Sequence, residues 1–496
     1  MKWLSPSLSD LFFLFITAWI FLVSPLGWER LLLDTDTALH IATGQIILST
    51  GSVPTTDPFS FSKPGEPWRA LEWGSEALFA WLFNTTGFKG ITLLAGVIIA
   101  LLITLLLKYA VWKGANGMIA LVVTLIATTA ISIHFFVRPH LFTLLFLAIA
   151  IWLVENNRRN GGRLVWLLIP LTVLWTNLHP GFVIFFILLA LRALGCAGEA
   201  WLQPPLRQER RHEAIQLVIL GAACSIASLA NPYGFHFHID IFEAVRAPWT
   251  LANATESKSP SFRTEEIFDY MILLFAGLAS VTSLARKKRL VEPLWILFLA
   301  YCSLVSVRHI TLFAVVASPI IAVEASEWWA SVAARWPRAS ILGMLDDFFR
   351  QLSIRLPGTS FFIPVAIVGL ALAPGLHWPS EYPEAGVPIK MIERHLDLFA
   401  TGRVFASDQM AGYLIFRNYP RQRVFFDSRH YFYATSKIGD DYLTMINGGT
   451  QWRALLDYYR FNVILCAIDT PIASLVQAAG GWRVVDRDPK FILFQR

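Results

Sequence analysis

The chain has 496 residues, of which 55% are apolar and only 15% are charged, and it contains 19 Trp and 37 Phe. This balance excludes an ordinary soluble protein of the same length and predicts a polytopic membrane protein. The net charge is +6, but the basic residues gather in short loops beside apolar stretches, as expected of cytoplasmic anchors. We therefore see no signal for nucleic-acid binding and expect membrane lipid as a partner.

Apolar stretches of about 16 to 23 residues recur along the chain and are long enough for membrane-spanning helices. We expect about eleven helices, give or take two, at 9–28, 90–112, 118–137, 140–156, 164–179, 182–199, 215–230, 267–285, 290–307, 310–326 and 358–374. The basic clusters all fall on one side if the N-terminus is cytoplasmic, and the C-terminus then lies outside. The predicted fold class is thus a polytopic α-helical membrane protein, with residues 1–375 as its transmembrane module.

The first outer loop, 29–89, is too long for a simple connector, and we expect it to be folded. Its apolar residues recur at helical spacing from Asp36, and Asp36 and His40, four apart, share one side of that helix. Gly51 is expected to end the helix. A turn-rich connector and a second amphipathic stretch at 71–83 follow. This loop therefore presents an acidic residue and an imidazole at the membrane surface.

The composition changes after the last predicted span, and residues 376–496 read as a soluble outer α/β domain. Strands are expected at 402–407, 422–427, 461–467, 482–487 and 490–495, and helices at 432–446, 450–459 and 470–479. Of the four cysteines only Cys466 falls in this domain, so no disulfide framework is expected. The sequence also has no phosphate-binding or dinucleotide motif and no Cys-x-x-Cys, so it gives no sign of ATP, a dinucleotide or structural zinc.

Polar residues near the ends of the spans collect on the outer side. Two of them, Arg138 and Arg308, oppose the positive-inside trend, so we expect them to meet an anion such as a lipid-linked phosphate. The candidate site residues are Asp34, Asp36, His40, Arg138, His140, Asn177, His179, Asn231, Tyr233, Glu256, Arg308 and His309. Their convergence on one face, beside one acidic loop, carries the prediction.

Each candidate also has a simpler explanation. Asp34 and Asp36 have the positions of a helix N-cap and a first-turn acid. A histidine at an interface often bonds a backbone carbonyl, and an arginine there often reaches to lipid headgroups. The segment that contains Asn231 and Tyr233 has the composition of a turn, and Glu256 has the setting of a solvated loop charge.

Taken together, the motifs resemble the GT-C superfamily of integral membrane glycosyltransferases. The layout is similar to that of protein mannosyltransferases and lipid A aminoarabinose transferases, and most similar to a large bacterial branch. The motifs that carry the resemblance are Asp36-x3-His40-x3-Gly44, Gly51-x2-Pro54-x2-Asp57-Pro58-Phe59-Ser60, Trp68-x3-Glu72-Trp73, Trp175-x-Asn177-x-His179, Asn231-Pro232-x-Gly234, Arg308-His309, Gly412-Tyr413-Leu414 and Val424-Phe425-Phe426-Asp427-x-Arg429.

The resemblance implies an inverting transfer of sugar from a polyprenyl-phosphate donor to a glycan, lipid or protein acceptor outside the bacterial inner membrane. It places the catalytic base on Asp36 or Asp34, and Asp36 is preferred. Arg308 and Arg138 are the expected partners of the donor phosphate, with His179 or His40 as a secondary donor. A divalent ion, Mg²⁺, Mn²⁺ or Ca²⁺, held by Asp34 and Asp36 is left open.

Two other functions stay open on the sequence. A transporter or flippase for a lipid-linked saccharide would place ionisable groups near the middle of the bilayer, where this chain has almost none. A non-catalytic assembly factor would tolerate loss of the acidic pair. The sequence favours the transferase because its polar residues gather at the outer surface.

Overall fold

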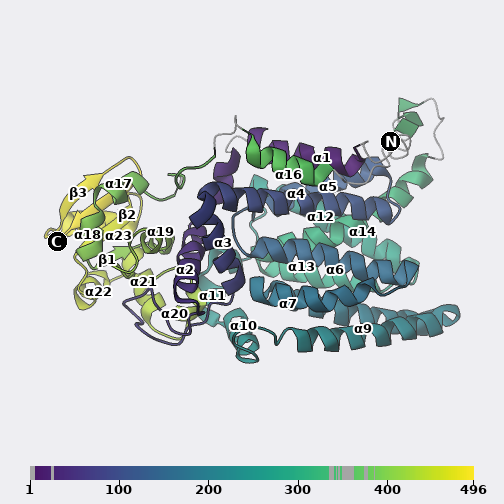
Figure 1. Cartoon of the computed structure of the whole chain (residues 1–496), viewed down its shortest axis with the longest axis horizontal. Coiled ribbons are helices and arrows are strands. Elements are labelled where there is room, and N and C mark those ends of the chain that lie inside the picture. The colour runs from purple at the N-terminus through teal and green to yellow at the C-terminus, as the bar shows by residue number, and fades with distance from the viewer. Residues whose placement is uncertain are drawn as a thin grey trace.

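The computed structural model describes residues 6–23, 27–333, 362–373, 378–384 and 386–496, together with a few positions between 340 and 348. Long helices lie side by side in a bundle, and a small domain with a β-sheet lies beyond one end of it (Figure 1). Several shorter helices lie across the bundle at that same end. The candidate site is built there.

A helix overlaps each of the eleven predicted spans. They are α1 (Leu8–Ala18), α4 (Phe88–Trp112), α5 (Gly117–Ser132), α6 (His140–Asn160), α7 (Leu168–Leu178), α8 (Val183–Leu202), α9 (Arg207–Ala227), α12 (Phe268–Arg286), α13 (Val291–Val305), α14 (Ile310–Ala333) and α16 (Phe362–Leu372). Among the described residues, five helical segments are long and apolar enough to cross a membrane by themselves. The number eleven therefore stays a prediction, and part of its last span lies outside the described residues.

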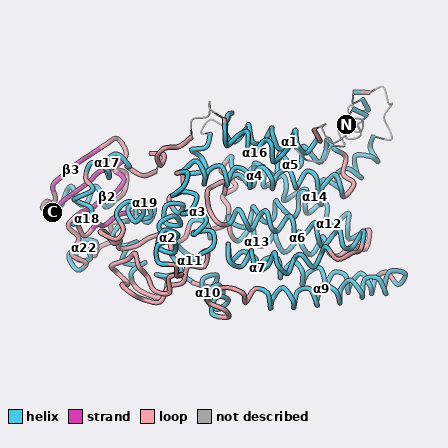
Figure 2. Tube along the Cα trace, viewed as in Figure 1, coloured by secondary structure: helices cyan, strands magenta, loops and turns pink. Residues whose placement is uncertain are grey.

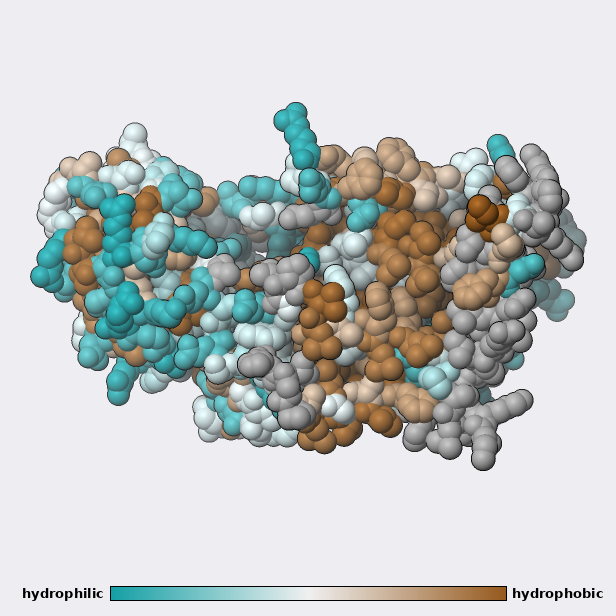
Figure 3. All heavy atoms as spheres, turned by 90° about the horizontal axis from the view of Figure 1, so that it is seen from above, coloured by the Kyte–Doolittle hydropathy of each residue, from teal (hydrophilic) through white to brown (hydrophobic). Residues whose placement is uncertain are grey.

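The surface of the bundle has the polarity that a lipid environment requires. Apolar side chains form a broad band over the helices, whereas the visible face of the C-terminal domain is mainly polar (Figure 3). Since lipid-facing helices must expose apolar side chains and a water-facing domain need not, these surfaces indicate a multi-pass membrane protein with one domain outside the bilayer.

The predicted helix of the first outer loop is confirmed as α2 (Asp36–Thr50), and Gly51 ends it with a φ of 65°. The second amphipathic stretch forms α3 (Trp73–Thr86). The two helices pack very closely, because a Cβ on Gly44 would lie 1.9 Å from the carbonyl oxygen of Glu76. A glycine at position 44 is therefore needed to bring the polar side of α2 against the start of α3.

The second outer segment contains α10 (His236–Arg246) and α11 (Pro248–Asn253). The Trp249 indole of α11 lies against the C-terminal domain, donating to Asp440 at 2.9 Å. Its ring also contacts Phe426 and His430. The loop that follows α11 is thereby anchored at a point beyond the bundle.

The C-terminal domain is a four-stranded mixed sheet with helices. The strands are β1 (Val404–Ala406), β2 (Val463–Ala467), β3 (Arg483–Arg487) and β4 (Phe491–Gln495), in the order β1-β2-β4-β3, and only the β1–β2 pair is parallel. Figure 2 shows the four strands gathered in this domain. The helices are α17 (Ile389–Arg394), α18 (Leu396–Thr401), α19 (Asp408–Asn418), α20 (His430–Tyr433), α21 (Ile438–Ile446), α22 (Trp452–Tyr458) and α23 (Pro471–Ala479).

One predicted strand, 422–427, is wrong. This segment does not join the sheet, because its backbone pairs with the first outer loop: Val424 donates to Phe59 O, and Phe61 donates to Val424 O, both at 2.9 Å. The predicted boundary between the two modules, at 375–376, lies outside the described residues. The C-terminal domain thus shares backbone hydrogen bonds with a loop far from it in sequence.

Arg429 makes this junction an ionic one. Its guanidinium bonds Asp427 in a bidentate pair at 2.8 and 2.7 Å and reaches Asp57 of the outer loop at 2.8 Å. It also lies 4.6 Å from the centre of the Trp68 ring. All three charged side chains are buried, so the C-terminal domain holds the first outer loop through one enclosed network.

Candidate active site

Three carboxylates meet at one guanidinium at the outer end of the bundle. Arg138 contacts Asp34 in a close ion pair, Asp36 at 2.7 Å and Glu256 at 2.6 Å. Asp36 begins α2 and Asp34 lies two residues before it, Arg138 lies between α5 and α6, and Glu256 lies in the turn after α11. The structure therefore brings together four of the predicted residues from three separate segments.

Several hydrogen bonds hold the backbone around this cluster in place. Val137 donates its N–H to Leu31 O at 2.8 Å, and the Thr37 hydroxyl donates to Val137 O at 2.7 Å. The Ser306 hydroxyl holds the carbonyl of Glu256 at 2.7 Å. These bonds fix Arg138 between the two acidic segments, so its position does not depend on the ion pairs alone.

Two of these carboxylates, Asp34 and Glu256, differ in their acidity. Burial raises the pKa of Asp34 to about 6, although Arg138 opposes the shift. Burial also works against ionised Glu256, but there Arg138 prevails and lowers the pKa of Glu256 to about 2. The cluster thus contains one carboxylate that stays charged and one that takes up a proton under mildly acidic conditions.

Arg138 also bears on the predicted cation site. Its guanidinium already lies against both Asp34 and Asp36, and Asp34 Oδ1 accepts the N–H of Asp36 at 2.9 Å. In this arrangement Arg138 provides the positive charge that an ion bridging the pair would otherwise provide. A divalent ion at Asp34 and Asp36 stays a prediction.

A second polar cluster lies beside the first, on the facing sides of α2 and α3. His40 Nδ1 is 3.2 Å from Glu76 Oε1, and His40 Nε2 is 3.4 Å from Glu72 Oε2. The other oxygen of Glu72 is 3.3 Å from His179 Nε2. Burial opposes a charge on His40, yet the hydrogen bond that His40 donates to Glu76 and the charge of Glu72 raise its pKa to about 9. Burial also raises the pKa of Glu72 to about 7.

The sequence did not single out Glu72 and Glu76 as site residues. A signal for them was present, because they are four residues apart at the start of a predicted amphipathic helix, the same spacing as Asp36 and His40. The close packing of the two helices sets these two pairs against each other. Such a contact between helices cannot be read from either helix alone.

The other predicted residues contact their surroundings in different ways. Arg308 is exposed and donates to the Ser257 hydroxyl at 2.8 Å, next to Glu256. Among the described residues no carboxylate lies within ion-pair distance of Arg308. The rings of His140 and His309 lie against backbone carbonyls, at 2.8 and 3.2 Å. Arg308 is therefore an exposed cation beside the Arg138 cluster.

The remaining three candidates make hydrogen bonds that hold loops together. Asn177 accepts from the Trp73 indole at 2.9 Å and donates to Ala230 O. The Asn231 amide closes a turn by bonding Tyr233 N and Gly234 O. The Tyr233 hydroxyl accepts from Ala70 N and donates to Pro54 O. In this structure these residues shape the outer surface around the two clusters.

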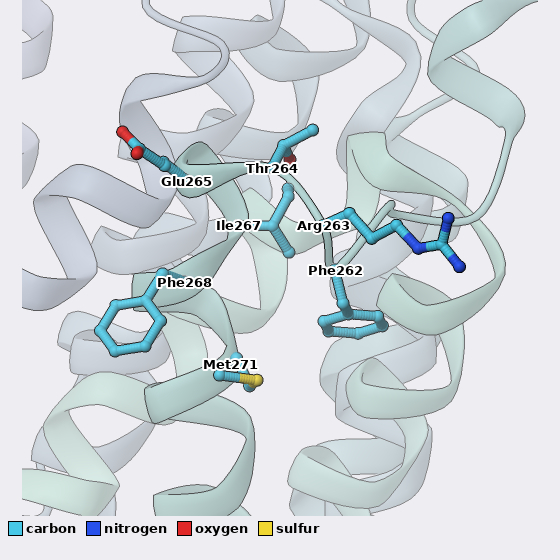
Figure 4. A pocket seen from close by; sticks show the side chains of 7 residues that line it. All are labelled: Phe262, Arg263, Thr264, Glu265, Ile267, Phe268 and Met271. Carbon is cyan, nitrogen blue, oxygen red and sulfur yellow. The ribbon is translucent and has the colours of Figure 1, made fainter.

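An open hollow of about 390 Å³ lies in the same outer segment as Glu256. It is lined by Phe262, Arg263, Thr264, Glu265, Ile267, Phe268 and Met271. Figure 4 shows two aromatic rings and a thioether around it, with the Arg263 side chain directed away from Glu265. An apolar hollow at the start of a membrane helix is suited to a hydrocarbon chain.

The chain was compared with known proteins and structures. No protein-family model and no curated protein sequence matches it. Among solved structures it resembles the archaeal oligosaccharyltransferase AglB from Archaeoglobus fulgidus in complex with an inhibitory peptide and a dolichol-phosphate, with a TM-score of 0.58 and 10% identity, covering 93% of this chain and 69% of that one.

Two further structures of the Archaeoglobus fulgidus oligosaccharyltransferase match over the same shares of both chains. The apo form has a TM-score of 0.52 at 11% identity, and the form tethered to an acceptor peptide containing the NVT sequon has 0.51 at 12%. Identities this low establish a common fold without establishing a common reaction. The predicted layout of many helices followed by a small C-terminal domain is confirmed, because this chain shares the fold of these oligosaccharyltransferase structures.

Proposed function

We propose that this protein is a membrane glycosyltransferase that moves a sugar from a polyprenyl-phosphate-linked donor to a glycan, lipid or protein acceptor at the outer face of the membrane. The observation that carries the proposal is the convergence of Asp34, Asp36 and Glu256 on Arg138 at the outer end of a GT-C fold. A half-buried cluster of three acids around one cation is a candidate functional site.

Asp36 is the proposed base. Asp34 uses Oδ1 to accept the Asp36 N–H and Oδ2 to pair with Arg138, so Asp36 is the better placed of the two to accept a proton. As an acceptor oxygen forms its bond to the anomeric carbon, its proton passes to the Asp36 carboxylate. The bond from that carbon to the phosphate oxygen breaks, the phosphate leaves with the electron pair, and the configuration inverts.

Arg308 is the proposed partner of the leaving phosphate. It is exposed, it lies beside Glu256 through Ser257, and a guanidinium can stabilise developing negative charge on phosphate. The hollow beside Phe262 and Phe268 would take the first isoprene units of the carrier. His309, His140 and Asn231 then act by holding the backbone around the phosphate.

We further propose that the protein lies in a bacterial inner membrane with its N-terminus in the cytoplasm. The supporting observation is that Arg158, Arg210 and Arg289, from three of the basic segments, line one small cavity and therefore lie on the same side of the bundle. The acidic cluster and the domain would then share the outer side.

The test is a reconstitution of the purified full chain with a panel of polyprenyl-phosphate sugars and with glycan, lipid and peptide acceptors. Release of carrier phosphate that requires both donor and acceptor would support the proposal. No release from any pair, with correctly folded protein, would contradict it and favour an assembly factor or a transporter. Transport would then be tested separately, by movement of an intact lipid-linked sugar across vesicles.

A further inference from the structure

We propose that His40, Glu72 and Glu76 bind one divalent transition-metal ion, of which Mn²⁺ and Zn²⁺ are the best fits. This site is distinct from the Arg138 cluster. The proposal does not rest on glycosyl transfer, because metal binding can be measured in the absence of any donor or acceptor.

The first argument is geometric. One ligand atom from each of these three side chains lies within 4.8 Å of the other two. Since metal–ligand bonds are about 2.0–2.2 Å long, ligand atoms around one ion lie about 3–4 Å apart, and small side-chain rotations achieve this. The three residues are on two packed helices, and the close approach at Gly44 fixes the distance between those helices.

The second argument is an unsatisfied oxygen. Glu76 is only 4% exposed, and its Oε2 has no hydrogen-bond partner among the described residues. Leaving a buried carboxylate oxygen unpaired costs roughly 1–3 kcal/mol or more. A cation between Glu76 and His40 would satisfy this oxygen with the side chains already present.

The third argument is the local charge. Arg138 is shared by three carboxylates of the neighbouring cluster. Glu72 and Glu76 consequently face only the His40 ring at ion-pair distance, together with the His179 ring beyond Glu72. Two carboxylates in a partly buried site thus outnumber their positive partners. A divalent ion that displaces the extra proton of His40 balances the two negative charges.

His179 is an orienting partner of this site and not a ligand. Its Nδ1 accepts the N–H of Gly181 at 2.9 Å and lies 2.8 Å from the Thr143 hydroxyl, which itself accepts from Trp175. With Nδ1 used as an acceptor, the ring carries its proton on Nε2, which faces Glu72 Oε1 at 3.3 Å. This N–H holds the Glu72 carboxylate in place, as outer hydrogen bonds do at metal sites.

The ligand set selects the kind of ion. Carboxylates alone suit Mg²⁺ and Ca²⁺, whereas an imidazole favours first-row transition ions. A set of two carboxylates and one imidazole therefore suits Mn²⁺ or Zn²⁺. Three protein ligands also leave coordination positions for water or an anion.

The experiment uses Mn²⁺ alone as the probe on the full chain in detergent, after removal of metal by a chelator. Electron paramagnetic resonance counts the bound ions, and electron spin echo modulation detects an imidazole nitrogen bound to them. We expect one Mn²⁺ per chain with one nitrogen coupling. Competition by Zn²⁺ should release it.

Four variants locate the site. His40→Gln should abolish the nitrogen coupling, and Glu76→Gln should weaken Mn²⁺ binding at least tenfold. The matched control Glu66→Gln, an exposed glutamate of the same outer loop, should leave affinity unchanged, as should Asp36→Asn in the neighbouring cluster. Thermal unfolding of each variant shows that the chain still folds.

The proposal is overturned if the wild type binds no Mn²⁺ or Zn²⁺. It is equally overturned if binding survives in folded Glu76→Gln and is lost in Asp36→Asn, since the ion would then belong to the Arg138 cluster. Failure of glycosyl transfer with metal binding intact would refute the proposed function and leave this site standing.

Discussion

The junction between the C-terminal domain and the first outer loop depends on Arg429, and removal of this side chain should destabilise the junction strongly. Arg429 is 6% exposed and Asp427 is 0% exposed. The Arg429→Met variant would leave Asp427 and Asp57 buried without their cation. Breaking a buried pair in this way costs about 3–5 kcal/mol.

This loss of stability should increase the fraction of molecules in which the first outer loop is open. If cleavage follows the equilibrium population of the open form, 3–5 kcal/mol raises the rate of proteolysis in 52–67 by about a hundred- to several-thousand-fold. Proteinase K is the suitable protease because it needs no basic residue. The loop contains exposed positions such as Gly65 and Glu66 at which it can cut once released.

The matched control is Arg417→Met. Arg417 pairs with Glu393 at 2.6 Å, but the two side chains are 39% and 35% exposed, and such pairs contribute about 0–1 kcal/mol. Arg429→Met combined with Asp427→Asn should recover part of the loss, because one uncompensated charge is removed. Equal cleavage rates in Arg429→Met and Arg417→Met would refute the reasoning.

Three further outcomes are expected. Gly44→Ala should lower the thermal unfolding temperature, because its Cβ would lie 1.9 Å from a backbone oxygen of α3, whereas Gly221→Ala, with nothing within 4 Å, should not. Transfer activity should fall as the pH drops below about 6, because burial raises the pKa of Asp34 to about 6. Protonation of the Asp34 carboxylate then weakens its ion pair with Arg138. In Glu256→Gln that midpoint should move to lower pH, since the charge of Glu256 helps to raise the pKa of Asp34; an unchanged midpoint would contradict this assignment. Trp249→Ala should speed proteolysis of 254–267 by about tenfold, because the indole anchors this segment to the C-terminal domain.

The sequence predicted the helices well because their signals are local. Apolar runs identify the long helices of the bundle, and the spacing after Asp36 together with Gly51 gives both ends of α2. The strand predicted at 422–427 failed because its apolar composition is that of a strand, whereas its backbone partner is Phe59 in a distant loop. Local pattern cannot identify a partner so far away in the chain.

In the candidate site, too, the features with a local signal were predicted and the contacts between distant segments were not. Outer-end polar residues were recognised by composition and position, and the structure groups Asp34, Asp36, Arg138 and Glu256 as one cluster. The mutual pairing of Arg138 with three carboxylates was not predicted, because the sequence shows charges without their neighbours. The packing of Glu76 against His40 was missed for the same reason.

The central claim is that the acidic residue at the start of α2 takes the acceptor proton in a glycosyl transfer. Its most direct test is single-turnover release of carrier phosphate by the wild type, by Asp36→Asn and by the control Asp269→Asn, a half-buried acid in the first turn of α12. We expect Asp36→Asn to be slower by about 10²–10⁴-fold, with donor binding retained and Asp269→Asn unaffected. Release by folded Asp36→Asn at the rate of the wild type would contradict the claim.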